Sequence, residues 1–323
     1  MTGKEKIIRA LKHQPIKGHV PHFEFQFFLT MEKFGKIHPR YINLHKWGQM
    51  SVREKEMQLQ YVADVYLETA GTYDYSAISV NFDVSVESQS DSNDAIHRLF
   101  EIIRERSGDQ YFIIIPGDAT YGIPNGSDMT EFSAHMYDEP EKMCEQAQRQ
   151  VDQRLEDIRK LRAEGLIDGI NLNSDYCFNT NSFFPPDIFS VLVAPYLKQL
   201  VDAYHSMGFY TIKHTDGNIM PIIDQIAASG TDGLQSIDPQ GGVDLKTVKK
   251  LYGDKLCLMG NVNCGLLQTG TDEEVRQDVL RSLRDGMPGY GYIFSTSNVV
   301  YPGMPLQRYE LMHSIWKEHG VYK

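Results

Sequence analysis

The sequence predicts an α/β protein in which eight parallel strands and their crossover helices close into a (β/α)8 TIM barrel, as a single domain over residues 1–323. Along the chain, short β-rich runs alternate with polar or glycine-containing loops and helical stretches. Parallel strands need such crossover helices, and eight is the number of strands that closes this barrel. No Ser/Gly-rich linker or charge block divides the chain, although its 323 residues could also make two small domains.

Eight apolar runs are predicted to be the strands. They cover residues 19–25, 74–80, 111–115, 167–173, 209–214, 232–237, 256–260 and 290–295. A helix over residues 4–12 precedes the first run, and we expect this N-terminal helical extension to cover the floor of the barrel. An open, doubly wound sheet is the alternative, but no G-x-G-x-x-G sequence follows the first strand to support it.

The helical stretches carry start and stop signals. Asp187 and Thr271 are predicted N-caps, and Glu274 completes a capping box with Thr271. Gly208 follows an amphipathic stretch at the position of a left-handed cap. The charged stretch 139–165 is predicted to form a long helix.

Composition excludes several classes of function. The formal charge is −11, and no run of Lys and Arg is longer than two residues, which argues against nucleic-acid and anionic-membrane partners. The four cysteines show no C-x-x-C spacing, as is usual in a reducing compartment. The first residues form no signal sequence, and no apolar run reaches the ~20 residues that span a bilayer. We therefore expect a cytoplasmic protein.

In a barrel of this kind the active site lies at the carboxyl ends of the strands. Polar residues follow nearly every predicted strand, and any one of them could be an ordinary loop residue, but together they indicate a ligand-binding mouth. They are Glu24, Gln26, Asn81, Asp83, Asp118, Asn173, Asp175, His214, Asp216, Asp238, Asn261, Asn263, Cys264, Ser295, Ser297 and Asn298.

His214 and Asp216 form the sharpest of these clusters, because both can point into the mouth from the end of the fifth strand. They could be a pair of metal ligands, or a histidine held by a carboxylate for acid–base chemistry. The plainer interpretation is that loop backbone satisfies His214 while Asp216 caps the helix that begins near Ile219. Cys177 and Cys264 also lie on mouth loops, but isolated cysteines are more often buried bystanders.

The loops of the predicted mouth are acidic and aromatic, with very few basic residues. Asp83, Glu87, Asp118 and Asp175 accompany several aromatic side chains, among them Tyr176, Phe178 and Phe183. Recognition of carboxylates or phosphates normally requires Arg forks or backbone nests. A neutral aromatic molecule or a cation therefore suits this mouth better than a polyanion.

Three segments together resemble the uroporphyrinogen decarboxylase superfamily over essentially the whole chain. They are KIIRALKHQPIKGHVPHFEF near the start, KHTDGNIMPIIDQIAASGTDGLQSIDPQGGVDLKTVKKLYGDKLCLMGNVNCGLLQTGT in the second half, and STSNVVYPGMPLQRYELM near the end. The resemblance implies a TIM barrel, in agreement with the strand count.

That superfamily contains two chemistries. Its true decarboxylases carry an Arg-rich loop after strand one that grips the carboxylates of the substrate, whereas here this loop reads FEFQFFLTMEKFGKIHPRY. Its cobamide-dependent methyltransferases include members that bind zinc through a His-x-Cys pair after strand five and a Cys after strand eight. The matching positions here are His214, Asp216 and Asn298, so a thiolate zinc site is not expected. A harder site on His214, Asp216 and a third oxygen or imidazole ligand is left open.

The resemblance to the methyltransferase branch implies transfer of a methyl group from a methoxyaromatic, methylated amine or thioether to Co(I) of a corrinoid. No D-x-H-x-x-G sequence is present, so the corrinoid is expected on a partner protein, and zinc and a homodimer are left open. His214 and Asp216 are the predicted catalytic residues and metal ligands. The predicted substrate-binding residues are Glu24, Asp175, Tyr176, Phe178, Phe183, Asn261 and Asn298. Uroporphyrinogen decarboxylation and a non-catalytic binding barrel are the alternatives.

Overall fold

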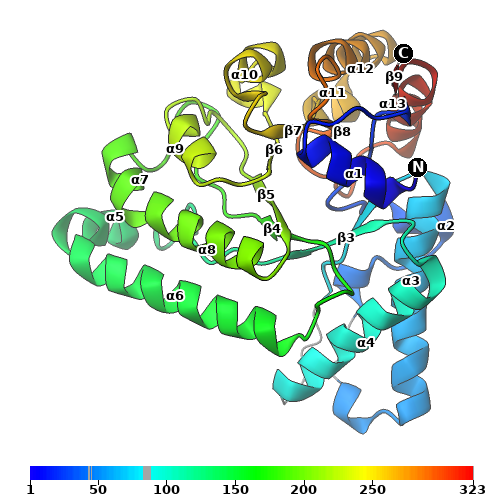
Figure 1. Ribbon diagram of the computed structural model, residues 1–323, viewed down its shortest axis with the longest axis horizontal. Coiled ribbons are helices and arrows are strands. Elements are labelled where there is room, and N and C mark those ends of the chain that lie inside the picture. The colour runs from blue at the N-terminus through cyan, green and yellow to red at the C-terminus, as the bar shows by residue number, and fades with distance from the viewer. Residues whose placement is uncertain (43, 45, 83–88, 323) are drawn as a thin grey trace.

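The computed structural model describes residues 1–42, 44, 46–82 and 89–322 (Figure 1). Its core is a curled sheet of seven parallel strands in the order β2-β3-β4-β5-β6-β7-β8. The strands are β2 Ala77–Ser79, β3 Phe112–Pro116, β4 Gly169–Leu172, β5 Tyr210–His214, β6 Gly233–Gln235, β7 Cys257–Val262 and β8 Tyr292–Thr296. Each of these strands corresponds to one of the predicted runs, and the predicted α/β barrel architecture is confirmed.

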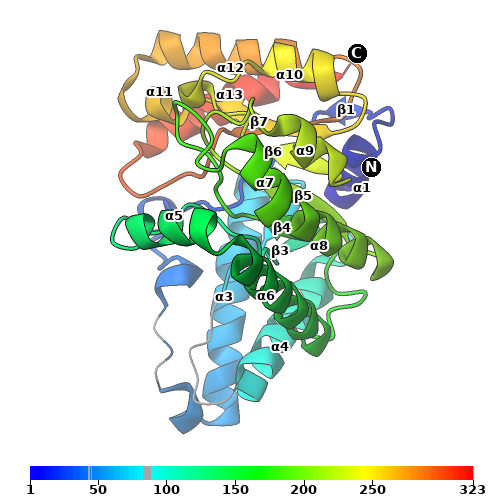
Figure 2. The same ribbon diagram turned by 90° about the vertical axis from the view of Figure 1, so that its left-hand side faces the viewer.

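Helices cover the outside of the curled sheet (Figures 1 and 2). In the second view α10 and α12 lie along one end of the molecule, while α3, α4, α6 and α8 lie toward the other. The longer helices are α1 Gly3–Leu11, α3 Val52–Thr72, α4 Gln89–Ser107, α5 Met129–Asp138, α6 Pro140–Lys160, α8 Ala194–Ser206, α10 Leu245–Tyr252, α12 Asp272–Gly286 and α13 Leu306–His319. The shorter ones are α2 Thr30–Phe34, α7 Pro186–Leu192, α9 Ile223–Ala228 and α11 Cys264–Thr269, with 3₁₀ turns at Pro39–Tyr41, Trp47–Gln49 and Pro239–Gly241.

The first predicted strand differs from what the structure shows. Instead of a strand over residues 19–25, β1 is only Gly18–His19, and it pairs antiparallel with β9, Val321–Tyr322, near the end of the chain. Residues 20–28, which we call the seam segment, then run extended between β8 and β2. Isolated bridges join this segment to the β8 side, at His22 with Phe294 and at Phe27 with Val300.

A few backbone hydrogen bonds close the barrel across the seam segment. The N–H of Phe294 donates to the carbonyl of Pro21 at 2.8 Å, and on the other side the N–H of Ser76 donates to the carbonyl of His22 at 2.7 Å. Next along the segment, the Glu24 carboxyl accepts the N–H of Thr296 at 3.0 Å. A side chain thus takes the place of a backbone acceptor, which explains why no regular strand forms here.

The predicted helix signals have mixed outcomes. The capping box of Thr271 with Glu274 is confirmed at the start of α12, and Gly208 has the left-handed conformation expected of a cap, with φ of +86°. The N-cap assigned to Asp187 is wrong, because α7 begins after Pro185 and Asp187 lies in its first turn. The long charged helix is α6.

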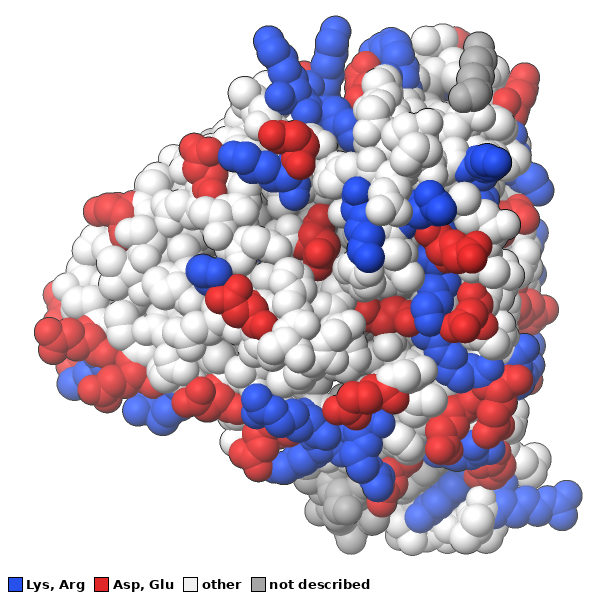
Figure 3. All heavy atoms as spheres, viewed as in Figure 1, with Lys and Arg blue, Asp and Glu red and all other residues white. Residues whose placement is uncertain are grey.

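Helix α1 packs against β2, β3 and β8, and its Lys4 N–H donates to the carbonyl of Gln110, just before β3. The helix therefore lies at the amino ends of the strands, as the predicted floor of the barrel. Among the described helices, none combines the length and the apolar character that a bilayer span requires. Figure 3 shows basic and acidic side chains interspersed over one face of the molecule, without a large basic patch.

Candidate active site

Three side chains converge at the carboxyl ends of β4 and β5. The Nε2 atom of His214 lies 3.6 Å from Oδ1 of Asp175 and 3.9 Å from Oδ2 of Asp216. One ligand atom from each residue lies within 4.8 Å of the other two. The backbone N–H of Asp216 donates to Oδ1 of Asp175 at 3.1 Å, which ties the two loops together. The predicted pair thus becomes a triad that we call the His214 cluster.

Gln235 sets the tautomer of the His214 ring, that is, which ring nitrogen carries the proton when the ring is neutral. Its side-chain nitrogen donates to the carbonyl oxygens of Asn298 at 3.1 Å and Thr296 at 3.4 Å. This orientation leaves Oε1 of Gln235 to contact Nδ1 of His214. Because an amide oxygen only accepts, Nδ1 must carry the proton, and this assignment follows from the hydrogen-bond network. In the neutral ring the lone pair on Nε2 then points toward Asp175 and Asp216.

Asp216 is held on one side and unsatisfied on the other. Its Oδ2 accepts a hydrogen bond from the side-chain amide of Asn298. Its Oδ1 is buried, and no described residue forms a well-aligned hydrogen bond with it, although the hydroxyl of Ser236 is near enough to lower the pKa of the carboxyl. Burial raises the pKa of Asp216 to about 6, with the nearby His214 acting in the opposite direction. Such an orphaned oxygen beside a nitrogen lone pair is an arrangement that a proton or a cation would satisfy.

The donor set of the His214 cluster fits a divalent metal ion. One imidazole nitrogen and two carboxylate oxygens suit zinc or a harder ion, and a second hydrogen bond from the ligating ring, here to Gln235, is the usual support for such a histidine. Among the described residues, neither Cys177 nor Cys264 belongs to the group of converging ligand atoms.

A buried ion pair lies behind the His214 cluster. The ammonium of Lys213 is 2.9 Å from Oδ2 of Asp118, and neither side chain is more than 4% exposed. Burial acts to raise the pKa of Asp118, but Lys213 and the N–H groups of Ser174 and Thr120 hold it below its ordinary value. Burial lowers the pKa of Lys213, and Asp118 offsets this only in part.

Tyr176 belongs to this buried group and not to the open mouth. The Lys213 ammonium lies 3.9 Å from the centre of the Tyr176 ring, and the phenol oxygen is 2.6 Å from the hydroxyl of Thr120. Tyr176 is fully buried. The structure therefore places it as a cover over Lys213, away from the position that substrate stacking would need.

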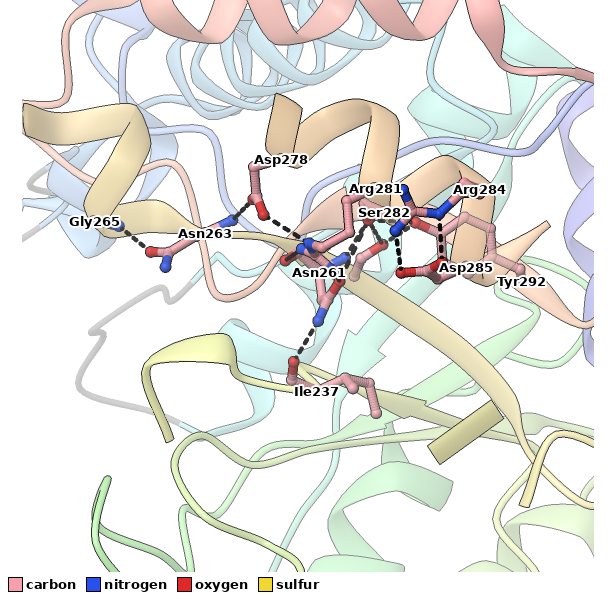
Figure 4. Close-up of polar contacts among 11 residues, drawn as sticks. Ile237, Asn261, Asn263, Gly265, Asp278, Arg281, Ser282, Arg284, Asp285 and Tyr292 are labelled. Carbon is pink, nitrogen blue, oxygen red and sulfur yellow. Dashed lines mark hydrogen bonds and ion pairs between the residues drawn. The ribbon is translucent and has the colours of Figure 1, made fainter. Parts of the chain in front are cut away.

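Asn261 is likewise used within the fold. Its side-chain nitrogen donates to the carbonyl of Ile237 at 2.7 Å, and its Oδ1 accepts from Arg281 of α12 at 3.0 Å, as Figure 4 shows. Asn261 has no exposed surface, and its side chain makes these contacts within the fold. Asn298, by contrast, lies on the His214 cluster through its bond to Asp216.

The two predicted aromatic residues Phe178 and Phe183 differ in how far their side chains are buried. Phe183 packs against Phe132 and Phe184, whereas Phe178 is 43% exposed and meets the ring of Phe183 at 6.0 Å. The sequence analysis did not single out Phe25. The centre of its ring lies 6.2 Å from that of the His214 ring, in an edge contact. Phe25 is therefore the aromatic neighbour of the His214 cluster.

Glu24 lies in the barrel seam. Besides the N–H of Thr296, it accepts the Thr296 hydroxyl at 2.7 Å, and burial raises its pKa to about 8 against the effect of these hydrogen bonds. A chain of contacts runs from Glu24 through Thr296 and Gln235 to His214. The sequence analysis missed Gln235, although a glutamine ending the apolar strand β6 was a signal that could have identified it.

Basic side chains are scarce around the His214 cluster. Among the described residues, no Arg or Lys forms an ion pair or hydrogen bond with the side chain of Asp175, His214 or Asp216. The one lysine beside the cluster, Lys213, is committed to Asp118. Asp83 and Glu87, which the sequence places in the mouth, lie outside the described residues.

Comparison with known proteins identifies the family. The family model for uroporphyrinogen decarboxylase (URO-D) matches residues 119–319. Relatives include the uroporphyrinogen decarboxylases of Dichelobacter nodosus, 29% identical over 108 residues (33% of this chain, 30% of the relative), and of Chlorobium luteolum, 23% identical over 214 residues (62% and 57%). The matched parts thus span less than two thirds of each relative's length.

A solved structure described as a methyltransferase from Methanosarcina mazei has the same fold. It aligns with a TM-score of 0.74 and 16% identity, over 98% of this chain and 99% of that one. This likeness extends the fold comparison to the N-terminal part that the family model does not match. On the family match, the chain belongs to the uroporphyrinogen decarboxylase family.

Proposed function

We propose that the protein is a methyltransferase that moves a methyl group from a small donor to Co(I) of a corrinoid carried by a partner protein. The donor would be a methoxyaromatic, a methylated amine or a thioether. The observation that carries the proposal is the His214 cluster, an imidazole facing two carboxylates at the barrel mouth with no cationic clamp among the described residues.

In this proposal the side chains of the cluster act on the leaving group. A departing alkoxide, aryl oxide or amine leaves more readily when it is protonated, and a proton on Nε2 of His214 would face it. Asp175 and Asp216 would stabilise the imidazolium that carries this proton. After the transfer the ring is a neutral imidazole, and Gln235 keeps the proton on Nδ1 throughout. Bound to His214, Asp175 and Asp216, a zinc ion would instead supply Lewis acidity to the same leaving group.

The other proposed binding residues surround the cluster. Phe178, the exposed aromatic side chain of the loop after β4, would cover an aromatic donor, and Asn298 would hold Asp216 in place. Asp175, with a side chain 47% exposed, is the member of the cluster that an incoming ligand meets first.

Decarboxylation of uroporphyrinogen is the second candidate, and the family match and the names of the relatives favour it. Its substrate carries many carboxylates, which require Arg or Lys partners. The acidic cluster, without such partners in the described part of the chain, argues against this substrate. We therefore rank it below methyl transfer.

One assay separates the two candidates. The protein is incubated with cob(I)alamin and, in turn, methoxybenzene, methylamine and dimethyl sulfide, and the absorbance of methylcobalamin is followed. We expect turnover with at least one donor and a loss of about 100-fold or more in His214→Ala, the range for a lost general acid. His205→Ala is the matched control, because His205 pairs with Asp232 outside the cluster and should leave the rate unchanged.

The same preparations are incubated with uroporphyrinogen while CO₂ is measured. Release of CO₂ that disappears in His214→Ala, without any methylcobalamin, would replace the proposed function by decarboxylation. No turnover of any donor or of uroporphyrinogen would leave a binding barrel as the better description.

A further inference from the structure

A small cavity with a mostly apolar wall lies beside the His214 cluster, between the seam segment, α3 and β2. Its wall includes Glu24, Phe25 and Gln26 of the seam segment, His38 of the following turn, Val65 of α3 and Ile78 of β2. About 360 Å³ is free of protein atoms, and the centre of a water molecule can reach about 30 Å³ of it. Only a group of a few heavy atoms therefore fits.

Gln26, which lines this cavity, has an unsatisfied acceptor. The residue is only 8% exposed, and its buried Oε1 has no hydrogen-bond partner among the described residues. Its backbone carbonyl is occupied by the N–H of Val300 at 3.0 Å. Because a buried acceptor left without a donor is costly, this oxygen indicates a bound group that donates a hydrogen bond.

His38 presents a donor to the same cavity. Its Nδ1 accepts the backbone N–H of Arg40 at 3.2 Å, so the proton of the neutral ring is on Nε2. The ring is neutral near pH 7 because burial lowers the pKa of His38 to about 4, with Arg40 acting in the same direction. His38 lines the cavity, and no hydrogen bond of its Nε2 occurs among the described residues, so this N–H is the donor that the proposal assigns to a ligand.

The wall offers no charge that would compensate an ion. Among the described residues that line the cavity there is no Lys or Arg, and the single carboxyl group, that of Glu24, has its pKa raised to about 8 by burial. An anion would therefore lack a cationic partner. An ammonium ion could satisfy Gln26, but it has no lone pair to accept the Nε2–H of His38. A hydroxyl group can do both, since it is a donor and an acceptor at once.

We propose that this cavity binds an uncharged hydroxyl group, either a small alcohol or the hydroxyl end of a longer molecule, which donates to Gln26 and accepts from His38. Phe25 lines the cavity and also contacts the His214 ring, so the bound molecule would lie next to the cluster. The inference goes beyond the proposed methyl transfer and is tested by equilibrium binding, without a corrinoid.

The test is an NMR titration of the full-length protein labelled at isoleucine and valine methyl groups. Ile78 and Val65 line the cavity and report on its contents. Ethanol, acetate and ethylammonium serve as probes of similar size and different charge. We expect saturable shifts of these methyl signals with ethanol, with a dissociation constant no tighter than about 1 mM for so small a ligand, and none with the two ions.

Gln26→Leu removes the acceptor and should weaken ethanol binding about tenfold. Gln26→Met, which keeps the length of the side chain, serves if the first variant is misfolded. Gln148→Leu, at an exposed position of α6 where Gln148 bonds only Asp152, is the control with unchanged binding. Stronger binding of acetate or ethylammonium, equal ethanol binding in the Gln26 variants, or no shift with any probe would each overturn the proposal, the last leaving a water-filled cavity.

Discussion

Glu24 is a carboxyl group that the fold buries without a cationic partner. Both of its oxygens accept hydrogen bonds from Thr296, yet burial dominates and raises its pKa to about 8. At neutral pH the carboxyl is therefore mostly protonated in the folded protein, whereas in the unfolded chain it is ionised. A buried acid of this kind links the stability of the barrel seam to pH.

Replacing Glu24 by glutamine should remove this dependence on pH. The folded-state pKa is higher than the unfolded one, so the contribution of Glu24 is fully present below about pH 4.5 and is lost as the pH rises to about 8. The free energy of unfolding of the wild type should fall relative to Glu24→Gln by about 1.4 kcal/mol per pH unit between pH 5 and 8. Urea unfolding at each pH measures it.

The exposed variant Glu141→Gln, on α6, is the control for this series. Its difference from the wild type should show no such slope. A constant difference between Glu24→Gln and the wild type across pH 5–8 would mean that the carboxyl is ionised in the folded protein.

The chemistry of single residues was predictable where it depended on strand ends. His214, Asp216 and Asp175 were found because parallel strands end at one edge of a barrel, and the structure brings all three together. Tyr176 and Asn261 also follow strands, but their side chains are taken up by Lys213 and Arg281, which are distant in sequence. No local pattern shows whether a polar or aromatic residue at a strand end turns inward, and this required the tertiary structure.

At the scale of elements, α12 braces the end of β7. Arg281 donates to the side-chain oxygen of Asn261 at 3.0 Å and to its carbonyl at 3.2 Å. Asp278 accepts both the Nε–H of Arg281 at 2.8 Å and the N–H of Asn263 at 2.7 Å. Figure 4 shows that these bonds join one face of the helix to the strand and to the turn after it. The helix thus fixes the loop that leaves β7.

Two arginines on α12 provide a matched comparison of this brace. Arg281→Leu breaks charged hydrogen bonds to Asn261 and Asp278, and we expect it to lower the free energy of unfolding by about 2 kcal/mol. Arg284→Leu removes the contact of an arginine with a side chain 70% exposed to Asp285, whose side chain is 6% exposed. It leaves the bonds to β7 and its loop intact, and should lower the free energy of unfolding less than Arg281→Leu does. Chemical denaturation measures both. Equal effects would show that the bonds to Asn261 add no stability.

At the scale of the whole molecule, the regular alternation of strands and helices was enough to predict the barrel but not its closure. Strands β2 to β8 pair as the apolar runs indicated. The run at residues 19–25 alternates like a strand but contains Pro21 and Glu24. It forms isolated bridges, because Pro21 has no N–H to donate and the carboxyl of Glu24 accepts the N–H of Thr296. A strand pattern cannot reveal that a side-chain carboxyl takes the place of a backbone carbonyl as hydrogen-bond acceptor. The seam was therefore the part of the fold that sequence analysis predicted wrongly.

The seam should also be where the barrel opens first. The N–H groups of Ser76, Phe294 and Val300 bond to single carbonyls of the seam segment, whereas β4 and β5 pair in register from Gly169 with Tyr210 to Leu172 with Lys213. Local opening of the seam breaks few backbone hydrogen bonds. Hydrogen exchange of these three amides should therefore be about tenfold or more faster than that of the amides bonded between β4 and β5. Equal protection on both sides of the barrel would mean that it opens only by global unfolding.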